Sequence, residues 1–92
     1  SPVEVESAIV RHEKVLEVAV VGHADKDGLI KPKAFIVLRE GIRPDDALSD
    51  EIKAFVKAEL ASYKYPRWIE FLDELPKTAT GKIQRFKLRD AT

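Results

Sequence analysis

The spacing of hydrophobic positions predicts a small domain with both helices and strands. Near the N-terminus, apolar residues recur at intervals of three and four, which predicts a helix to about residue 12. Its buried stripe consists of Val5, Ala8, Ile9 and His12. Ser1, Pro2 and Glu4 have the form of a capping box at the start of this helix. We expect Glu4 and Glu6 to be solvated, and His12 to pack at the helix end rather than bind a ligand.

Two runs rich in β-branched and aromatic residues follow, and they predict an antiparallel pair of strands with a long connection. Residues 15–21 are mostly apolar, so we expect a central strand that ends at Gly22 with both faces covered. Residues 25–28 are a turn signal, and residues 33–38 form the second strand. We expect His23 to be a loop residue after the first strand.

The second half of the chain predicts a helix, a short strand and a final helix. Residues 49–62 combine a Ser49 cap and early carboxylates with an apolar stripe. Residues 68–72 alternate in polarity and predict a third strand. The final helix would be anchored by Ile83, Phe86 and Leu88. The expected fold is α+β, with a small three-stranded, mainly antiparallel sheet, packed helices and a lysine loop near the C-terminus.

Length and charge narrow the class of protein. The 92 residues suit one domain, residues 1–92, which is too small for a deep active site of its own. Sixteen basic and sixteen acidic residues cancel, so no global charge steers the chain to nucleic acid or membranes. The absence of cysteine excludes disulfides and thiolate metal sites. No run suits a membrane span or secretory signal, so we expect a cytoplasmic protein. The missing initiator Met and the cap at residue 1 suggest a piece of a longer polypeptide.

The clearest chemistry lies in the lysine loop, residues 76–85, which reads Pro-Lys-Thr-Ala-Thr-Gly-Lys-Ile-Gln-Arg. Thr78 and Thr80 offer hydroxyl groups, and Gly81 can adopt a positive φ or allow close backbone approach. Lys82 ends the run with a mobile ammonium group. This pattern is typical of a loop that presents a cation to an anionic ligand.

The spacing of the lysine loop excludes a nucleoside-triphosphatase P-loop. That motif needs Gly five residues before the Gly-Lys pair and Ser or Thr directly after it, and those positions hold Pro76 and Ile83. Residues 76–89 contain no acidic residue, and their basic residues are Lys77, Lys82, Arg85, Lys87 and Arg89. From the residues alone, a solvated turn before a basic helix accounts for this stretch as well as a ligand site does.

A second candidate site is the segment of residues 63–67, Tyr-Lys-Tyr-Pro-Arg. Aromatic rings interleaved with cations can hold a nucleotide by stacking on its base and pairing with its phosphates. Tyr63 and Tyr65 could instead cover the edge of the core, and the residues alone favour this packing role.

In this order, the motifs resemble the C-terminal domain of the adenylate-forming superfamily, which includes acyl- and aryl-CoA synthetases, peptide-synthetase adenylation domains and luciferases. The likeness covers nearly the whole chain and is carried by residues 4–6, 18–22, 33–35, 63–66, 75–78 and 80–85. Residues 27–35 and 63–69 look most like benzoate-CoA ligases.

The resemblance implies a two-step reaction in a full-length enzyme whose larger N-terminal domain and hinge precede residue 1. An aromatic acid and ATP, with Mg²⁺, would form an acyl-adenylate, and coenzyme A would then form the thioester and release AMP. Lys82 matches the family's adenylation lysine. Tyr63, Tyr65 and Arg67 fall where relatives contact coenzyme A, although Tyr65 replaces a cation that some relatives carry. The 92 residues alone should be inactive.

The resemblance also implies regulation. Relatives with this loop are substrates of protein lysine acetyltransferases, so we expect acetylation of Lys82, reversed by a deacylase. The expected partners are the N-terminal domain and the small-molecule substrates, with no nucleic acid, membrane or metal ligand. One alternative is an adenylate-forming enzyme that passes its acyl group to a carrier protein. A less favoured alternative is a separate module whose basic C-terminal stretch binds RNA or an acidic partner.

Overall fold

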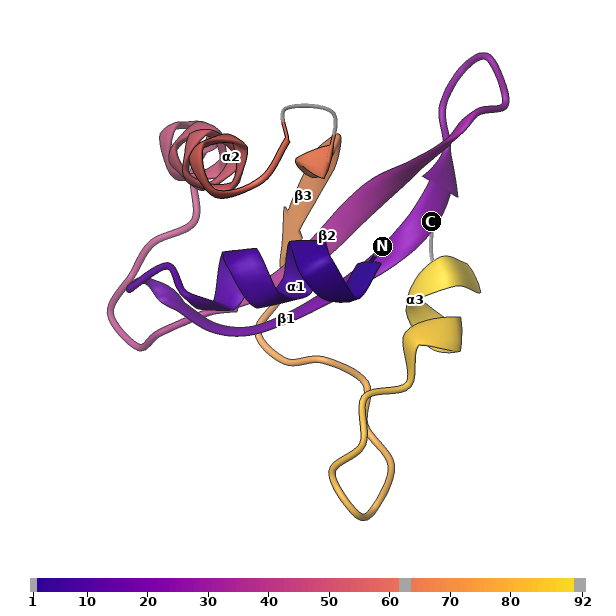
Figure 1. The fold of residues 1–92 in the computed structure, drawn as a ribbon. Helices are drawn as coiled ribbons and strands as arrows, with labels where there is room; N and C mark the ends of the chain where they lie inside the picture. The colour runs from indigo at the N-terminus through magenta and orange to yellow at the C-terminus, as the bar shows by residue number, and fades with distance from the viewer. Residues whose placement is uncertain (1, 62–63, 91–92) are drawn as a thin grey trace.

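Within residues 2–61 and 64–90, which are those that the computed structural model describes, three helices and three strands form an α+β fold (Figure 1). In chain order they are α1 (Pro2–Val10), β1 (Val15–Ala24), β2 (Ile30–Leu38), α2 (Asp46–Glu59), β3 (Trp68–Phe71) and α3 (Arg85–Asp90). The predicted α+β class is confirmed. The predicted cap at Ser1 lies outside the described residues.

The sheet has the order β1-β2-β3, so β2 is the central strand. β1 and β2 pair antiparallel, from Val15 opposite Leu38 to Ala24 opposite Ile30. β2 and β3 pair parallel, from Lys33 beside Trp68 to Ile36 beside Phe71. The sheet is therefore mixed, with antiparallel pairing along its longer ladder. The prediction that the first strand is central is wrong, because its apolar run reflects cover on both faces and not partners at both edges.

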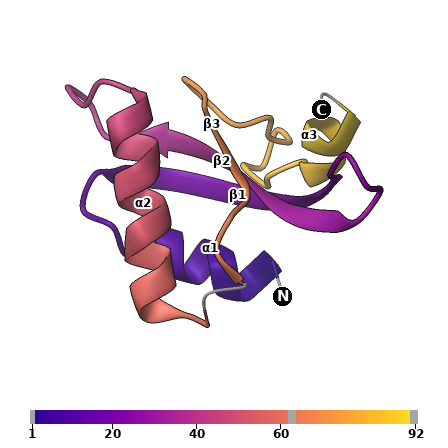
Figure 2. The same ribbon diagram turned by 90° about the horizontal axis from the view of Figure 1, so that it is seen from above.

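Side chains from alternate positions of the strands enter two hydrophobic clusters on opposite faces of the sheet. The cluster under α1 and α2 contains Val5, Ala8, Ile9, Val15, Val18, Val20, Ala34, Ile36, Leu48, Ile52 and Val56. The cluster on the other face contains Ala19, Val21, Phe35, Val37, Leu75 and Leu88. Figure 2 shows α1 and α3 on opposite sides of the strands. β1 thus contributes to both clusters.

The ends of the two longer helices differ from the prediction. α1 ends at Val10, but His12 is buried as expected, with its ring edge-on to Phe55 at a centroid distance of 5.1 Å. Its Nε2 lies 2.8 Å from a carboxylate oxygen of Glu51. α2 begins before Ser49, because the Asp45 carboxylate accepts a 2.7 Å hydrogen bond from the Leu48 N–H and caps the helix there. α2 ends at Glu59, before residue 62.

Two further predictions are corrected by the strand pairing and the packing of α3. β1 continues through Gly22 to Ala24, because its ladder with β2 continues that far. His23 is therefore a strand residue, and its ring packs edge-on against Trp68 at 4.7 Å. Phe86 does not anchor α3, since it is 52% exposed, whereas Leu88 is buried and Ile83 is partly buried against the same cluster.

Candidate functional site

The lysine loop is a small hairpin that extends away from the sheet (Figure 1). The Gly81 N–H donates to the Thr78 carbonyl at 2.9 Å, and the Thr78 N–H donates to the Lys82 carbonyl at 2.8 Å. Gly81 has φ of 88°. This arrangement matches a three-residue hairpin loop with glycine in the left-handed position. A Cβ at this position would meet nothing within 4 Å, so glycine is not needed here for lack of space. It is needed because a side chain disfavours the positive φ.

The two threonine hydroxyls stabilise the tip of the lysine loop. The Lys82 N–H donates to Thr78 Oγ1 at 3.1 Å, and Thr78 Oγ1 lies 3.1 Å from Thr80 Oγ1. These contacts fix the backbone of Lys82 while its side chain remains exposed. Among the described residues, none pairs with the Lys82 ammonium group. The structure thus brings Thr78, Thr80, Gly81 and Lys82 together in one hydrogen-bonded turn, in which the Lys82 ammonium group is exposed.

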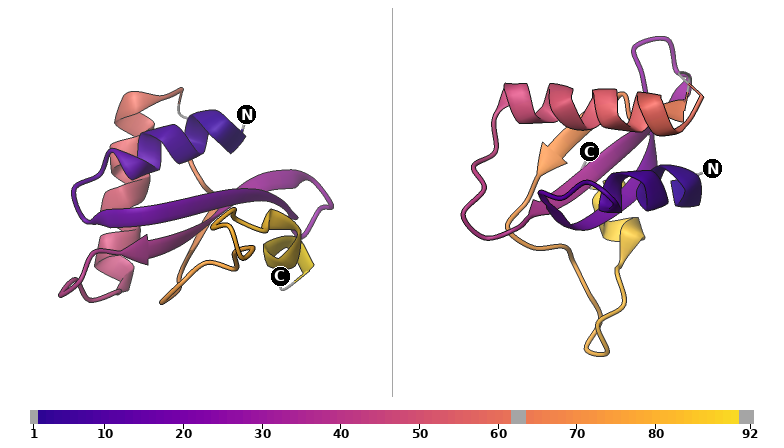
Figure 3. Two further views of the ribbon diagram at one scale, coloured as in Figure 1. Left: turned by 90° about the horizontal axis from the view of Figure 1, so that it is seen from below. Right: turned by 60° about the vertical axis from the view of Figure 1, so that its left-hand side comes forward.

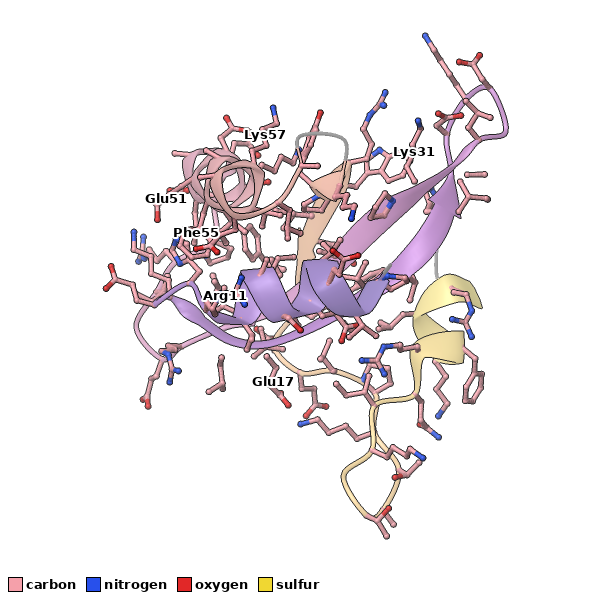
Figure 4. All side chains as sticks on the ribbon, in the orientation of Figure 1. Arg11, Glu17, Lys31, Glu51, Phe55 and Lys57 are labelled. Atoms are coloured by element: carbon pink, nitrogen blue, oxygen red, sulfur yellow. The ribbon has the colours of Figure 1, made fainter. Side chains whose placement is uncertain are left out.

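Both legs of the lysine loop are attached to the body of the domain by ion pairs that the sequence patterns did not reveal. Lys77, on the first leg, pairs with Glu17 of β1. Figure 4 shows the Glu17 side chain on the side of β1 that faces the loop. Arg85, after the second leg, donates two hydrogen bonds to the Glu6 carboxylate, at 2.9 and 2.6 Å. Glu6 is 17% exposed, so the prediction that it is solvated is wrong.

The basic residues of the lysine loop differ in whether they form an ion pair. Lys77 and Arg85 hold the base of the loop, whereas Lys82 directly follows the turn at its tip. The right-hand view of Figure 3 shows the loop extending away from α2. Hydrogen bonding to Glu6 raises the pKa of Arg85 above its ordinary value, although burial opposes this change. The geometry is therefore that of an anchored arm with an unpaired charge at its end.

Comparison with known proteins gives this geometry a family. The AMP-binding enzyme C-terminal domain matches residues 4–82, which is most of the chain. The chain belongs to this family. It is 69% identical over 91 residues to the benzoate–CoA ligase of Thauera aromatica, covering 99% of this chain and 17% of that protein.

Solved structures of CoA ligases share the fold of this AMP-binding enzyme C-terminal domain. The anthranilate CoA ligase AuaEII, solved with anthranoyl-AMP, has a TM-score of 0.93 and 58% identity, covering 99% of this chain and 18% of that one. A benzoate CoA ligase from Burkholderia xenovorans LB400 has a TM-score of 0.89 and 62% identity, covering 97% and 18%. The chain therefore spans less than a fifth of the length of these relatives.

The second candidate site, residues 63–67, is only partly described in this AMP-binding enzyme C-terminal domain. Tyr63 lies outside the described residues. Tyr65 packs against the cluster under α1 and α2, and the Lys57 ammonium lies over its ring, 4.2 Å from the centroid. Arg67 is exposed, and its guanidinium lies 5.8 Å from the centroid of the Trp68 ring. Tyr65 thus helps to cover the core edge, whereas Arg67 is accessible to a ligand.

The described part of the domain contains no group of three or more His, Cys, Asp or Glu side chains that could hold a metal ion. No described helix has the length and apolar character needed to cross a bilayer.

Proposed function

We propose that this chain is the mobile C-terminal domain of an AMP-forming aryl-CoA ligase. The full-length enzyme would convert benzoate, ATP and coenzyme A to benzoyl-CoA, AMP and pyrophosphate. The similarity to benzoate–CoA ligases over nearly the whole chain supports this substrate class. The observation that carries the proposal is the unpaired Lys82 ammonium at the tip of a hydrogen-bonded hairpin.

In the first step, Lys82 would act as an electrostatic clamp and not as a base. A benzoate oxygen bonds to the α-phosphorus of ATP while the bond to pyrophosphate breaks, so negative charge spreads over carboxylate, phosphate and leaving group. An ammonium held near these oxygens stabilises the charge and fixes the geometry of attack. The turn of residues 78–82 suits this role because it orients the Lys82 backbone before the substrate arrives.

In the second step, the domain would rotate about a hinge that precedes residue 1. This motion would withdraw Lys82 and present residues 63–67 to coenzyme A, whose thiol attacks the adenylate carbonyl and releases AMP. We assign Tyr63, Tyr65 and Arg67 to the nucleotide part of coenzyme A. The exposed guanidinium of Arg67 beside the Trp68 ring supports phosphate binding there.

The test compares the two half-reactions in the full-length ligase carrying Lys82→Ala. Adenylation is followed by pyrophosphate release from benzoate and ATP without coenzyme A, and thioester formation is followed from pre-made benzoyl-adenylate. We expect adenylation to fall by roughly 10²–10³-fold, the scale for losing one charge-stabilising group, with thioester formation nearly unchanged. Lys87→Ala removes an exposed lysine of α3 and is the matched control. If Lys82→Ala leaves both half-reactions intact, the clamp assignment is wrong.

We also propose that Lys82 is the site of reversible acetylation, because acetylation removes the charge that the clamp requires. Lys77 lies in the same loop but is held by Glu17, which makes it an internal control. Peptide mass analysis after incubation with acetyl-CoA and a protein lysine acetyltransferase should place the label on Lys82, and a deacylase should restore adenylation. A label on Lys77, or no label, would contradict this assignment.

A further inference from the structure

The Glu6 carboxylate joins three elements that lie far apart in the sequence. It projects from α1, accepts a 2.8 Å hydrogen bond from the Val20 N–H of β1, and accepts two hydrogen bonds from Arg85 at the start of α3. Because β1 is an edge strand, the Val20 N–H that Glu6 caps points away from β2. One side chain therefore ties the helix, the free edge of the sheet and the end of the lysine loop together.

This interaction differs in geometry and burial from the exposed ion pair of Arg11 and Glu59. Glu6 is 17% and Arg85 40% exposed, and the two side chains make a bidentate contact. Paired hydrogen bonds between arginine and carboxylate fix direction as well as distance. In contrast, Arg11 and Glu59 form a single contact with both side chains about half exposed. The Glu6 contact is thus suited to positioning a segment.

Backbone hydrogen bonds at the base of the lysine loop join the leg that ends at Arg85 to the leg that begins at Pro76. The Gln84 N–H donates to the Pro76 carbonyl at 2.8 Å, and Lys77 and Ile83 form a β-bridge. Leu75, just before the loop, and Leu88, within α3, are both buried. Beyond this base, the tip is held by its own turn. The direction of the Lys82 side chain is therefore set where the loop joins the domain.

We propose that Glu6 is a positioning residue for Lys82 and that it acts through Arg85. This inference rests on the proposed adenylation role of Lys82. Without Glu6, the loop would pivot about its base, and Lys82 would sample many positions around the reacting phosphate. A misplacement of about 1 Å can cost about 10²-fold in rate. Coenzyme A binds elsewhere in the proposed function, so thioester formation would not depend on this contact.

The experiment uses the full-length ligase with Glu6→Ala, Glu6→Gln and Arg85→Ala, assayed in both half-reactions. We expect Glu6→Ala and Arg85→Ala to lower adenylation kcat by about 10- to 100-fold, with the KM for ATP and thioester formation changed by less than about twofold. The adenylation kcat of Glu6→Gln should lie between those of wild type and Glu6→Ala, because the Gln amide oxygen can still accept a hydrogen bond from the Val20 N–H. The double variant Glu6→Ala/Arg85→Ala should be no worse than either single variant. Glu59→Gln removes the negative charge from the exposed pair with Arg11 and is the control.

Hydrogen–deuterium exchange on the same full-length variants tests the anchor without activity. Peptides that cover residues 76–84 should exchange faster in Glu6→Ala and Arg85→Ala than in wild type and Glu59→Gln. Unchanged exchange would overturn the anchor, as would equal losses in both half-reactions, which would indicate a general structural role. Normal adenylation in Glu6→Ala, when Lys82→Ala is defective, would overturn this inference alone. Normal adenylation in Lys82→Ala would overturn the proposed clamp role of Lys82 and this inference with it.

Discussion

Gly81→Ala tests whether the turn of the lysine loop holds Lys82 in place. Gly81 has φ of 88°, and its missing Cβ would meet no atom within 4 Å. The substitution therefore introduces backbone strain without a steric clash. For a residue with a Cβ, the left-handed conformation costs roughly 1–2 kcal/mol. The hairpin tip extends away from the sheet and its packed faces (Figure 1), so we expect the strain to be relieved by rearrangement of the turn.

If that free energy is lost from the positioning of Lys82, adenylation should slow by about 5- to 30-fold, since about 1.4 kcal/mol corresponds to a factor of ten. The assay is pyrophosphate release by the full-length ligase at saturating benzoate and ATP. Gly41→Ala is the matched control, because Gly41 has φ of 85° and equally open surroundings in the loop before α2. It should carry the same strain but leave adenylation unchanged. Equal losses in both variants, or none in Gly81→Ala, would refute the reasoning.

Two further predictions concern stability, measured by urea unfolding of the 92-residue chain. Leu88→Ala should lower the free energy of unfolding by about 2–5 kcal/mol, because Leu88 is 4% exposed. Phe86→Ala should lower it by less than about 0.5 kcal/mol, because Phe86 is 52% exposed. Similar losses in the two variants would contradict the observed packing of α3. Glu51 has a pKa below its ordinary value of 4.5, chiefly through its hydrogen bond from Lys14 and also through His12. Because the folded pKa is the lower one, the stabilisation is present above pH 4.5 and lost as pH falls through the folded value. The stability difference between wild type and Glu51→Gln should therefore vanish in acid, and a difference that grew there would contradict this pairing.

The sequence predicted what local spacing encodes. The buried stripe of α1 and the three strands follow from periodicity. A positive φ at Gly81 was one of the two roles that its sequence position allowed. The position of Lys82 at the end of an exposed turn follows in the same way. These features depend on neighbours within a few residues, so the order of residues along the chain is enough to predict them.

Pairing order and long-range contacts could not be predicted in this way. The apolar run of β1 is the same whether the strand is central or at an edge, so the prediction of a central position had no means of telling the two apart. Glu6 lies 79 residues before its partner Arg85 and looks like an ordinary solvated carboxylate on a helix. The predicted Ser49 cap of α2 was wrong for a related reason, since both Asp45 and Ser49 can cap a helix and the fold selects Asp45.

The capped edge of β1 also has a consequence for association between molecules. An exposed edge strand offers unpaired N–H and carbonyl groups to a strand from another chain, which is a common route to aggregation. The Glu6 carboxylate accepts a hydrogen bond from the Val20 N–H in the middle of this edge, where an incoming strand would otherwise pair. A second chain would have to displace that carboxylate from both Val20 and Arg85 before it could pair. The side chain that we propose to position the lysine loop would therefore also disfavour pairing of another chain at this edge of the sheet.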